Sequence, residues 1–231
     1  MTPVLSLRDY ALHYDTFTGP VRILDDISLD IARGEVLGLV GESGSAKSSL
    51  ANAVIRDLPG RVHDEHGAIK LTGEDITNLP QPALEALRGR RIAMVFQNAA
   101  TTLDPVQTLG DHLLETLGRH TKLDPTARRA RAIELLDMVG LPDPEAMLGR
   151  YPHEVSGGEK QRVVLALAFG CEPELILFDE PTSALDATTA ATLLDLFREL
   201  QARTGVSALF ISHDLGTVAE IAHRVAVIYG G

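Results

Sequence analysis

Apolar residues occur along the chain in short runs that are separated by stretches of helical composition. Examples of such apolar runs are found in the segments RIAMVF, LILFDE and VSALFIS. Apolar runs of this kind, without regular polar alternation, are typical of strands that are buried on both faces, as in parallel sheets. The pattern predicts an α/β domain with a mostly parallel sheet.

The N-terminal part of the chain has a different pattern. Strand-type runs cover residues 4–7, 21–31 and 36–40, and breaks that contain glycine separate them. Such closely spaced runs with turn residues between them are typical of antiparallel strands. We expect an antiparallel β lobe at this end of the chain.

The segment between Gln97 and Ser156 changes to amphipathic helices. One helix is predicted to begin at Asp124, an N-cap residue followed by Pro125 in the first turn, and to end at Gly140. We therefore predict one domain over residues 1–231. Residues 98–156 form an inserted helical lobe, and residues 1–97 and 157–231 form the β lobe and the core.

Composition narrows the classes of function. The formal net charge of -11 argues against a surface that binds nucleic acid. The single Cys171 cannot form an internal disulfide, and the charged N-terminus does not resemble a signal peptide, so a reducing cytoplasm fits best. The longest apolar stretch, VVLALAFG, is far shorter than the roughly 20 residues that cross a bilayer. We expect a chain that does not span a membrane alone.

The segment GESGSAKSS lies between an apolar run, EVLGLV, and a stretch of helical composition. A glycine-rich loop between a strand and a helix directs backbone N–H groups and the helix dipole toward one point, which suits a phosphate. Lys47 is expected to reach the β- and γ-phosphates, and the Ser48 hydroxyl to hold Mg²⁺. The alternative is a tight turn without a ligand. The residues predicted to bind nucleotide are Gly41, Ser43, Gly44, Ser45, Ala46, Lys47, Ser48 and Ser49.

Ala46 departs from the usual phosphate-binding pattern, which has glycine before the lysine. An added methyl group where the backbone approaches phosphate weakens binding, because glycine is useful there for its missing Cβ. If the φ angle of Ala46 is negative, the cost is steric and modest. We expect ATP binding to be retained.

Two acidic residues end the apolar run LILFDE. At the carboxyl end of a buried strand they are expected to lie near the phosphates. Asp179 would support Mg²⁺, and Glu180 would polarise the attacking water. The alternative is that both acids cap the helix after Pro181. His213 follows the run VSALFIS and is expected at the same end of the sheet, where it could contact the γ-phosphate or the water; a purely structural histidine is the alternative.

Together these motifs resemble the ABC-type ATPases, whose core is the P-loop NTPase fold. Gln97 in MVFQ is similar to the Q-loop, SGGEKQ to the signature, SALD to the D-loop and ISHD to the switch histidine. The resemblance implies ATP and Mg²⁺ as ligands, with Gln97, Glu180 and His213 as catalytic residues. It also implies that Gln97 joins Ser48 and Asp179 at the metal.

The resemblance further implies that two subunits close on ATP. Ser156, Gly157 and Gly158 of one subunit would contact the γ-phosphate held by the other; taken alone, SGG before a helix is usually just an N-cap. Tyr14 stands near the place of the aromatic residue that stacks on adenine, with core packing as the alternative and Tyr10 as the rival. Glu159 departs from the family's usual Gln, and family members continue with more strand and helix where this chain ends.

A closer resemblance is to the ATP-binding subunits of bacterial importers for dipeptides and oligopeptides, with nickel importers nearby. It rests on QNAATTLDPVQTLGDHLLETL, YPHEVSGGEKQRV and DEPTSALDATTAATLLDLFRELQ. It implies a peripheral subunit on the cytoplasmic face of the membrane. The implied partners are a second ATP-binding subunit, permease subunits and, indirectly, a solute-binding protein. The alternatives are a soluble ABC-type ATPase of a non-transport complex and an inactive scaffold.

Overall fold

The computed structural model describes residues 2–97, 102–183 and 185–231, and in these ranges the strands form two sheets. The antiparallel sheet has the order β2-β1-β4-β5. Its strands are β1 (Leu5–Thr16), β2 (Gly19–Ile31), β4 (Val62–Leu71) and β5 (Glu74–Asp75). The second sheet has the order β6-β7-β8-β3-β9. Its strands are β3 (Val36–Val40), β6 (Ile92–Val95), β7 (Leu175–Asp179), β8 (Ser207–Ile211) and β9 (Arg224–Val227).

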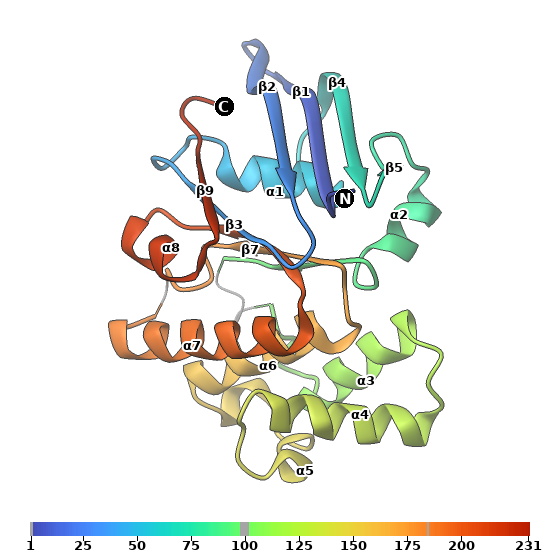
Figure 1. The fold of residues 1–231 in the computed structure, drawn as a ribbon. Helices are drawn as coiled ribbons and strands as arrows, with labels where there is room; N and C mark the ends of the chain where they lie inside the picture. The colour runs from blue at the N-terminus through green and yellow to red at the C-terminus, as the bar shows by residue number, and fades with distance from the viewer. Residues whose placement is uncertain (1, 98–101, 184) are drawn as a thin grey trace.

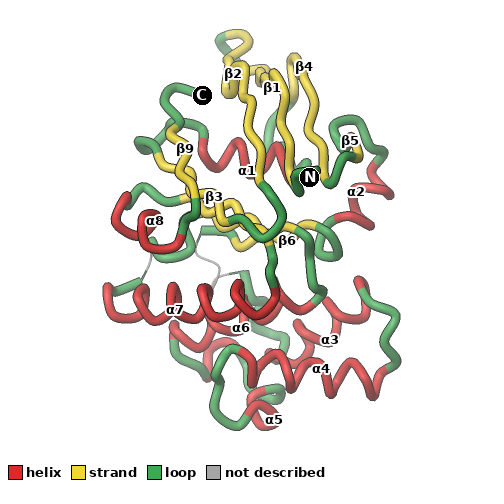
Figure 2. Tube along the Cα trace, in the orientation of Figure 1, coloured by secondary structure: helices red, strands yellow, loops and turns green. Residues whose placement is uncertain are grey.

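Helices cover both faces of the second sheet (Figures 1 and 2). Helix α1 (Lys47–Ile55) lies between the two sheets, and α6 (Gly157–Gly170) and α7 (Ala187–Thr204) lie on the opposite face. The remaining helices are α2 (Gln81–Leu87), α3 (Leu109–His120), α4 (Pro125–Met138), α5 (Pro144–Met147), the 3₁₀ turn η2 (Pro152–Glu154) and α8 (Leu215–Ile221).

The second sheet is parallel, and its central strands are fully buried. Every residue of β3, β7 and β8 is buried, and these strands pair in parallel with one another and with β6. This confirms the predicted mostly parallel sheet in an α/β fold. Because the strands run in the same direction, the loops after them emerge at the same edge.

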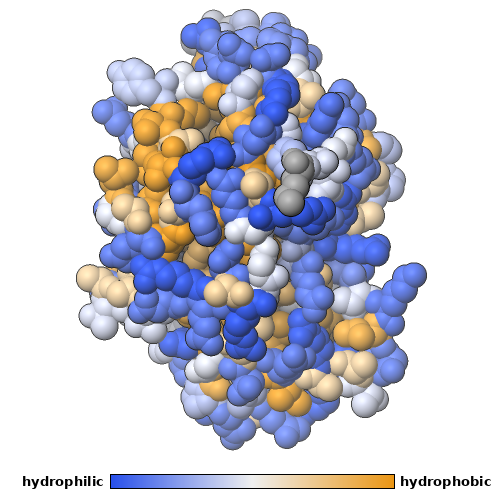
Figure 3. All heavy atoms as spheres, viewed as in Figure 1, coloured by the Kyte–Doolittle hydropathy of each residue, from blue (hydrophilic) through white to orange (hydrophobic). Residues whose placement is uncertain are grey.

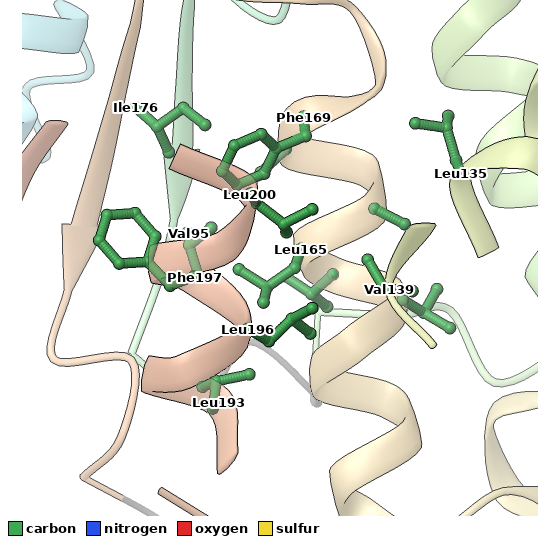
Figure 4. Packing of buried hydrophobic residues seen from close by; sticks show 14 of the residues in the cluster. Val95, Leu135, Val139, Leu165, Phe169, Ile176, Leu193, Leu196, Phe197 and Leu200 are labelled. Atoms are coloured by element: carbon green, nitrogen blue, oxygen red, sulfur yellow. The ribbon is translucent and has the colours of Figure 1, made fainter. Parts of the chain in front are cut away.

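The core below the parallel sheet is formed where α7 packs on α6 (Figure 4). Phe197 of α7 meets Phe178 of β7 edge to face, with ring centroids 4.9 Å apart. The figure also shows these residues pointing between the two helices and the sheet: Leu165, Phe169, Ile176, Leu193, Leu196 and Leu200. Aromatic and aliphatic packing of this density fixes α6, and with it the position of the helix N-terminus.

The inserted helical lobe is present as predicted. Helix α4 begins after the N-cap Asp124, whose side chain accepts hydrogen bonds from Thr126 N–H and Ala127 N–H, and it ends before Gly140. Helices α3 and α4 both pack on α6, which also contacts β6 and α7. Because α6 packs against both the helical lobe and the core, the predicted boundary between them at residues 156 and 157 stays a prediction.

The N-terminal β lobe is confirmed with one correction: the run at residues 36–40, predicted as part of the lobe, is β3 of the parallel sheet, where it is buried on both faces. Two further details were not predicted. The short run at residues 4–7 belongs to β1, which continues to Thr16, and irregular pairing with β2 interrupts the alternation that would have revealed it. β4 was missed because most of its exposed positions are charged or histidine and its apolar residues do not alternate regularly, in VHDEHGAIKL.

A buried ion pair joins α1 to this lobe. The Arg56 guanidinium contacts the Glu65 carboxylate of β4, with side-chain exposures of 9% and 15%. The Tyr10 hydroxyl donates to Glu65 Oε1 at 2.7 Å. Burial and the neighbouring Glu65 raise the pKa of Tyr10, so this hydroxyl stays protonated. The helix that follows the phosphate-binding loop is therefore fixed to the β lobe at its C-terminal end.

Replacing Glu65 tests this attachment. Glu65→Gln keeps a hydrogen-bonding side chain but leaves the Arg56 charge uncompensated, so we expect the free energy of unfolding to fall by about 3 kcal/mol. Urea unfolding measures the change. Asp25→Asn removes one partner of the exposed Arg22 pair and should cost less than about 1 kcal/mol. Equal losses for the two variants would contradict the role of the buried pair.

Candidate active site

The loop between β3 and α1 is built as a phosphate cradle. A Cβ at Gly41 would lie 2.4 Å from the Ile228 carbonyl oxygen and 2.6 Å from Ser45 Oγ, so only glycine fits there. Gly44 has φ +80°, and a Cβ there would meet nothing within 4 Å, which leaves its backbone open. The Ser45 hydroxyl is buried and has no hydrogen-bond partner among the described residues. These features fit a ligand that has many acceptor oxygens, such as a phosphate.

Lys47 and Ser48 begin α1 at this loop. Lys47 is 5% exposed, and its Nζ donates to the carbonyls of Gly41 at 2.9 Å and Glu42 at 2.8 Å. The ammonium therefore lies inside the loop and has a third N–H to offer an anion. The Ser48 hydroxyl donates to Asp179 Oδ1 at 2.9 Å.

Asp179 is almost fully buried at the end of β7. Burial raises its pKa, and the adjacent Glu180 raises it further, whereas the hydrogen bond from Ser48 opposes the shift. A desolvated carboxylate beside a hydroxyl favours a bound cation, and Mg²⁺ commonly binds through one such carboxylate together with substrate phosphates. The described residues contain no cluster of three or more His, Cys, Asp or Glu that could hold a metal without such help.

The three residues predicted to be catalytic meet at one oxygen atom. Gln97, after β6, donates from Nε2 to Glu180 Oε2 at 3.4 Å. His213, after β8, places Nδ1 3.3 Å from the same Oε2. Glu180 has φ +48°, a left-handed conformation that is costly for a residue with a side chain. The alternative that Glu180 only caps the following helix does not account for these contacts.

A cleft of 510 Å³ joins the phosphate cradle to Gln97 and Glu180. It is also lined by residues that the sequence did not point to: Val21, Arg22, Ile23, Gly230 and Gly231. The view in Figure 3 shows apolar side chains gathered around β9 and the C-terminal end, and Val225, Val227 and Tyr229 are exposed there. Val21 is the first residue of a strand-type run, and nothing in the sequence marks it as exposed at the cleft.

Tyr14 and the three predicted signature residues are not among the residues that line this cleft. Tyr14 packs its ring against Gly60, and it is not among the lining residues, so its contact with adenine stays a prediction. The rival Tyr10 is fully buried in the core. Ser156 and Gly158 line a separate hollow of 240 Å³ at the N-terminus of α6. Parts of the Q-loop and D-loop motifs, residues 98–101 and Ala184, lie outside the described residues.

Comparison with known proteins agrees with this geometry. A model of the ABC transporter family matches residues 24–183. The chain belongs to this family. It is 42% identical to the dipeptide transport ATP-binding protein DppD of Bacillus subtilis, covering all of this chain and 69% of that protein. It is 43% identical to the probable D,D-dipeptide transport ATP-binding protein DdpD of Escherichia coli, over 99% of this chain and 70% of that one. The predicted family resemblance and its ATPase activity are confirmed.

Solved structures confirm the fold. A dimeric structure of the ATP-binding cassette MJ0796 bound to ADP and Pi has a TM-score of 0.84 and 27% identity, and it covers 98% of this chain and 95% of that one. The cbiO1 structure from Clostridium perfringens has a TM-score of 0.83 and 25% identity, and it covers 100% of this chain and 86% of that one. In the described ranges, no helix combines the length and apolar character needed to cross a bilayer.

The structure changes what we expect of Ala46, whose cost was predicted to be modest if its φ angle is negative. Its φ is +72°, at the N-cap of α1, so the condition for a mild, purely steric cost is not met. Alanine in the left-handed region costs about 1 kcal/mol relative to glycine. The departure from the usual glycine therefore strains the loop itself, apart from any effect on bound phosphate.

Replacing Ala46 tests this strain. Ala46→Gly should raise the free energy of unfolding of the nucleotide-free protein by about 1 kcal/mol, because the strain is relieved. Ala86→Gly, at an exposed position inside α2, should instead lower it by about 1 kcal/mol. Urea unfolding of both variants measures the two changes. Destabilisation by Ala46→Gly would show that the loop is not strained.

Proposed function

We propose that this chain is the ATP-binding and ATP-hydrolysing subunit of an importer of peptides. The observation that carries the proposal is the meeting of Gln97 and His213 at Glu180 Oε2, beside a complete phosphate cradle. An inactive scaffold would have no need for this arrangement at a strained backbone position. The type of cargo rests on the relatives, which are named as dipeptide and oligopeptide transport ATP-binding proteins.

The geometry supports a direct role for Glu180 in positioning water. Its carboxylate accepts a hydrogen bond from Gln97 and lies next to the His213 ring, so a water molecule held there is oriented by three polar groups. Phosphoryl transfer depends mainly on such positioning and on control of charge. Glu180 takes a proton from the water as the water oxygen bonds to the γ-phosphorus, and the bond from that phosphorus to the β,γ-bridging oxygen breaks to release ADP. His213 and Gln97 hold the geometry.

Mg²⁺ is proposed as the second ligand. Ser48 and Asp179 would hold it, since a hydroxyl and a buried carboxylate suit this hard cation, and Gln97 lines the same cleft as Ser48. When bound, Mg²⁺ would neutralise charge on the phosphates. Lys47 and the N-terminus of α1 provide the other positive potential at the cradle.

A second subunit is proposed to complete each site. The cleft that contains Lys47 is not lined by Ser156, Gly157 or Gly158. These three residues would therefore act on a nucleotide held by another subunit. The similar cassette MJ0796 has a dimeric structure with ADP and Pi. The partner is either a second copy or a related subunit.

An apolar groove beside Gln97 is the proposed contact for the permease. It has a volume of 380 Å³ and lies between α1, β6 and α6, where Met94, Val164 and Leu167 form part of its lining. Phe96, adjacent to Gln97, lines it and is 42% exposed. A partner in this groove would therefore act on the catalytic glutamine through one neighbouring residue. The proposal places the subunit on the cytoplasmic face of the membrane, with a solute-binding protein as an indirect partner.

Glu180→Gln tests the proposed chemistry. The variant should lose ATP turnover by about 10²-fold or more, because an amide cannot accept the proton from water, and it should still bind ATP. Phosphate release and calorimetric titration measure the two properties. Glu42→Gln is the control, because it removes the same charge from the exposed side of the loop. Turnover by Glu180→Gln near the unmodified rate would contradict the assignment.

A further inference from the structure

The Ser156 hydroxyl is already engaged within its own helix turn. Its Oγ donates to Glu159 Oε2 at 2.7 Å, and the Ser156 N–H donates to the same oxygen at 2.7 Å. The Glu159 N–H donates back to Ser156 Oγ at 3.3 Å. This capping box places a carboxylate at the N-terminus of α6, which is the end of the helix that faces the hollow described above.

The carboxylate remains charged at neutral pH. Hydrogen bonds from Ser156, and the positive charges of Arg150 and Arg162, lower the pKa of Glu159. An anion therefore already occupies the favourable potential of the helix N-terminus. A serine hydroxyl has one hydrogen, so Ser156 cannot donate it to Glu159 and to a phosphate at the same time.

We propose that Glu159 competes with the γ-phosphate of the opposing subunit for the Ser156 hydroxyl and for the N-terminus of α6, and so sets the ATP concentration at which two subunits close. This inference rests on the proposed two-subunit function. During closure the hydroxyl rotates from Glu159 to phosphate, and the like charges of carboxylate and phosphate approach each other. Glu159 acts on closure through Ser156 and through its charge.

A purely structural role for Glu159 is the competing explanation. Capping boxes occur elsewhere in the chain, at Thr108 with Asp111, where they only begin a helix. A structural cap and a competitor differ in their response to Glu159→Gln. The amide oxygen can still accept the two hydrogen bonds, so the cap persists, whereas the negative charge is removed.

The experiment measures ATP-dependent pairing by light scattering in the Glu180→Gln background, where bound ATP persists. Adding Glu159→Gln should lower the ATP concentration at half-maximal pairing by roughly threefold to tenfold. The difference should narrow at high salt, because it arises from charge. Glu154→Gln is the matched control: Glu154 is exposed and accepts a hydrogen bond from Tyr151 N–H at 2.7 Å in the same way, but it is not in the hollow at Ser156. The control should leave the midpoint unchanged.

The outcomes separate the two proposals. A lower midpoint for Glu159→Gln supports competition, because the loss of a stabilising helix cap alone would not make closure occur at a lower ATP concentration. Equal midpoints with and without Glu159→Gln overturn the competition while two-subunit closure stands. If ATP changes the mass of neither protein, closure itself is wrong, and the function proposed for Ser156 falls with it. A shift of the same size in Glu154→Gln would also overturn the inference, because general surface charge would then explain the effect.

Discussion

The parallel pairing of the buried strands is the constraint on which the active site depends. β6, β7 and β8 align so that Val95 pairs with Phe178 and Asp179 with Ile211. Their carboxyl ends therefore lie side by side, and Gln97, Glu180 and His213 come together although they are far apart in sequence. Burial on both faces holds this alignment, since a shifted strand would expose apolar residues of β7 or β8. The burial of apolar strand residues thus also fixes the positions of the three residues proposed to be catalytic.

A second feature of the site is that carboxylates lie where the negatively charged phosphates of ATP are expected to bind. Asp179 and Glu180 lie at the phosphate cradle, and Glu159 lies at the helix end proposed to meet the γ-phosphate. Lys47 and two helix N-termini are the opposing positive potential. ATP binding is therefore a balance of opposing charges, in which a single carboxylate can set an affinity. The strained backbone at Ala46 and Glu180 adds a conformational cost at the same place.

Much of this arrangement was predictable from sequence, because the site consists of short segments attached to buried strands. Apolar runs located β6, β7 and β8, and the structure brings the residues that follow these runs, Gln97, Glu180 and His213, together. Their catalytic roles stay predictions. What the sequence did not reveal depends on three-dimensional packing. β4 has charged outer positions, and the sequence does not determine the sign of φ at Ala46. The placement of Tyr14 against Gly60 and the approach of Gly230 and Gly231 to the cleft come from contacts between distant segments.

The central claim is that Gln97 and His213 act through Glu180, and a double-mutant cycle on ATP turnover tests it most directly. The rates of His213→Ala, Glu180→Gln and the double variant are compared under saturating ATP. The account predicts strong non-additivity: once Glu180 is replaced, the loss of His213 costs little more, because both groups hold the same water. Losses that multiply, with the full effect of His213→Ala retained in the Glu180→Gln background, would show that the two residues act independently and would contradict the account.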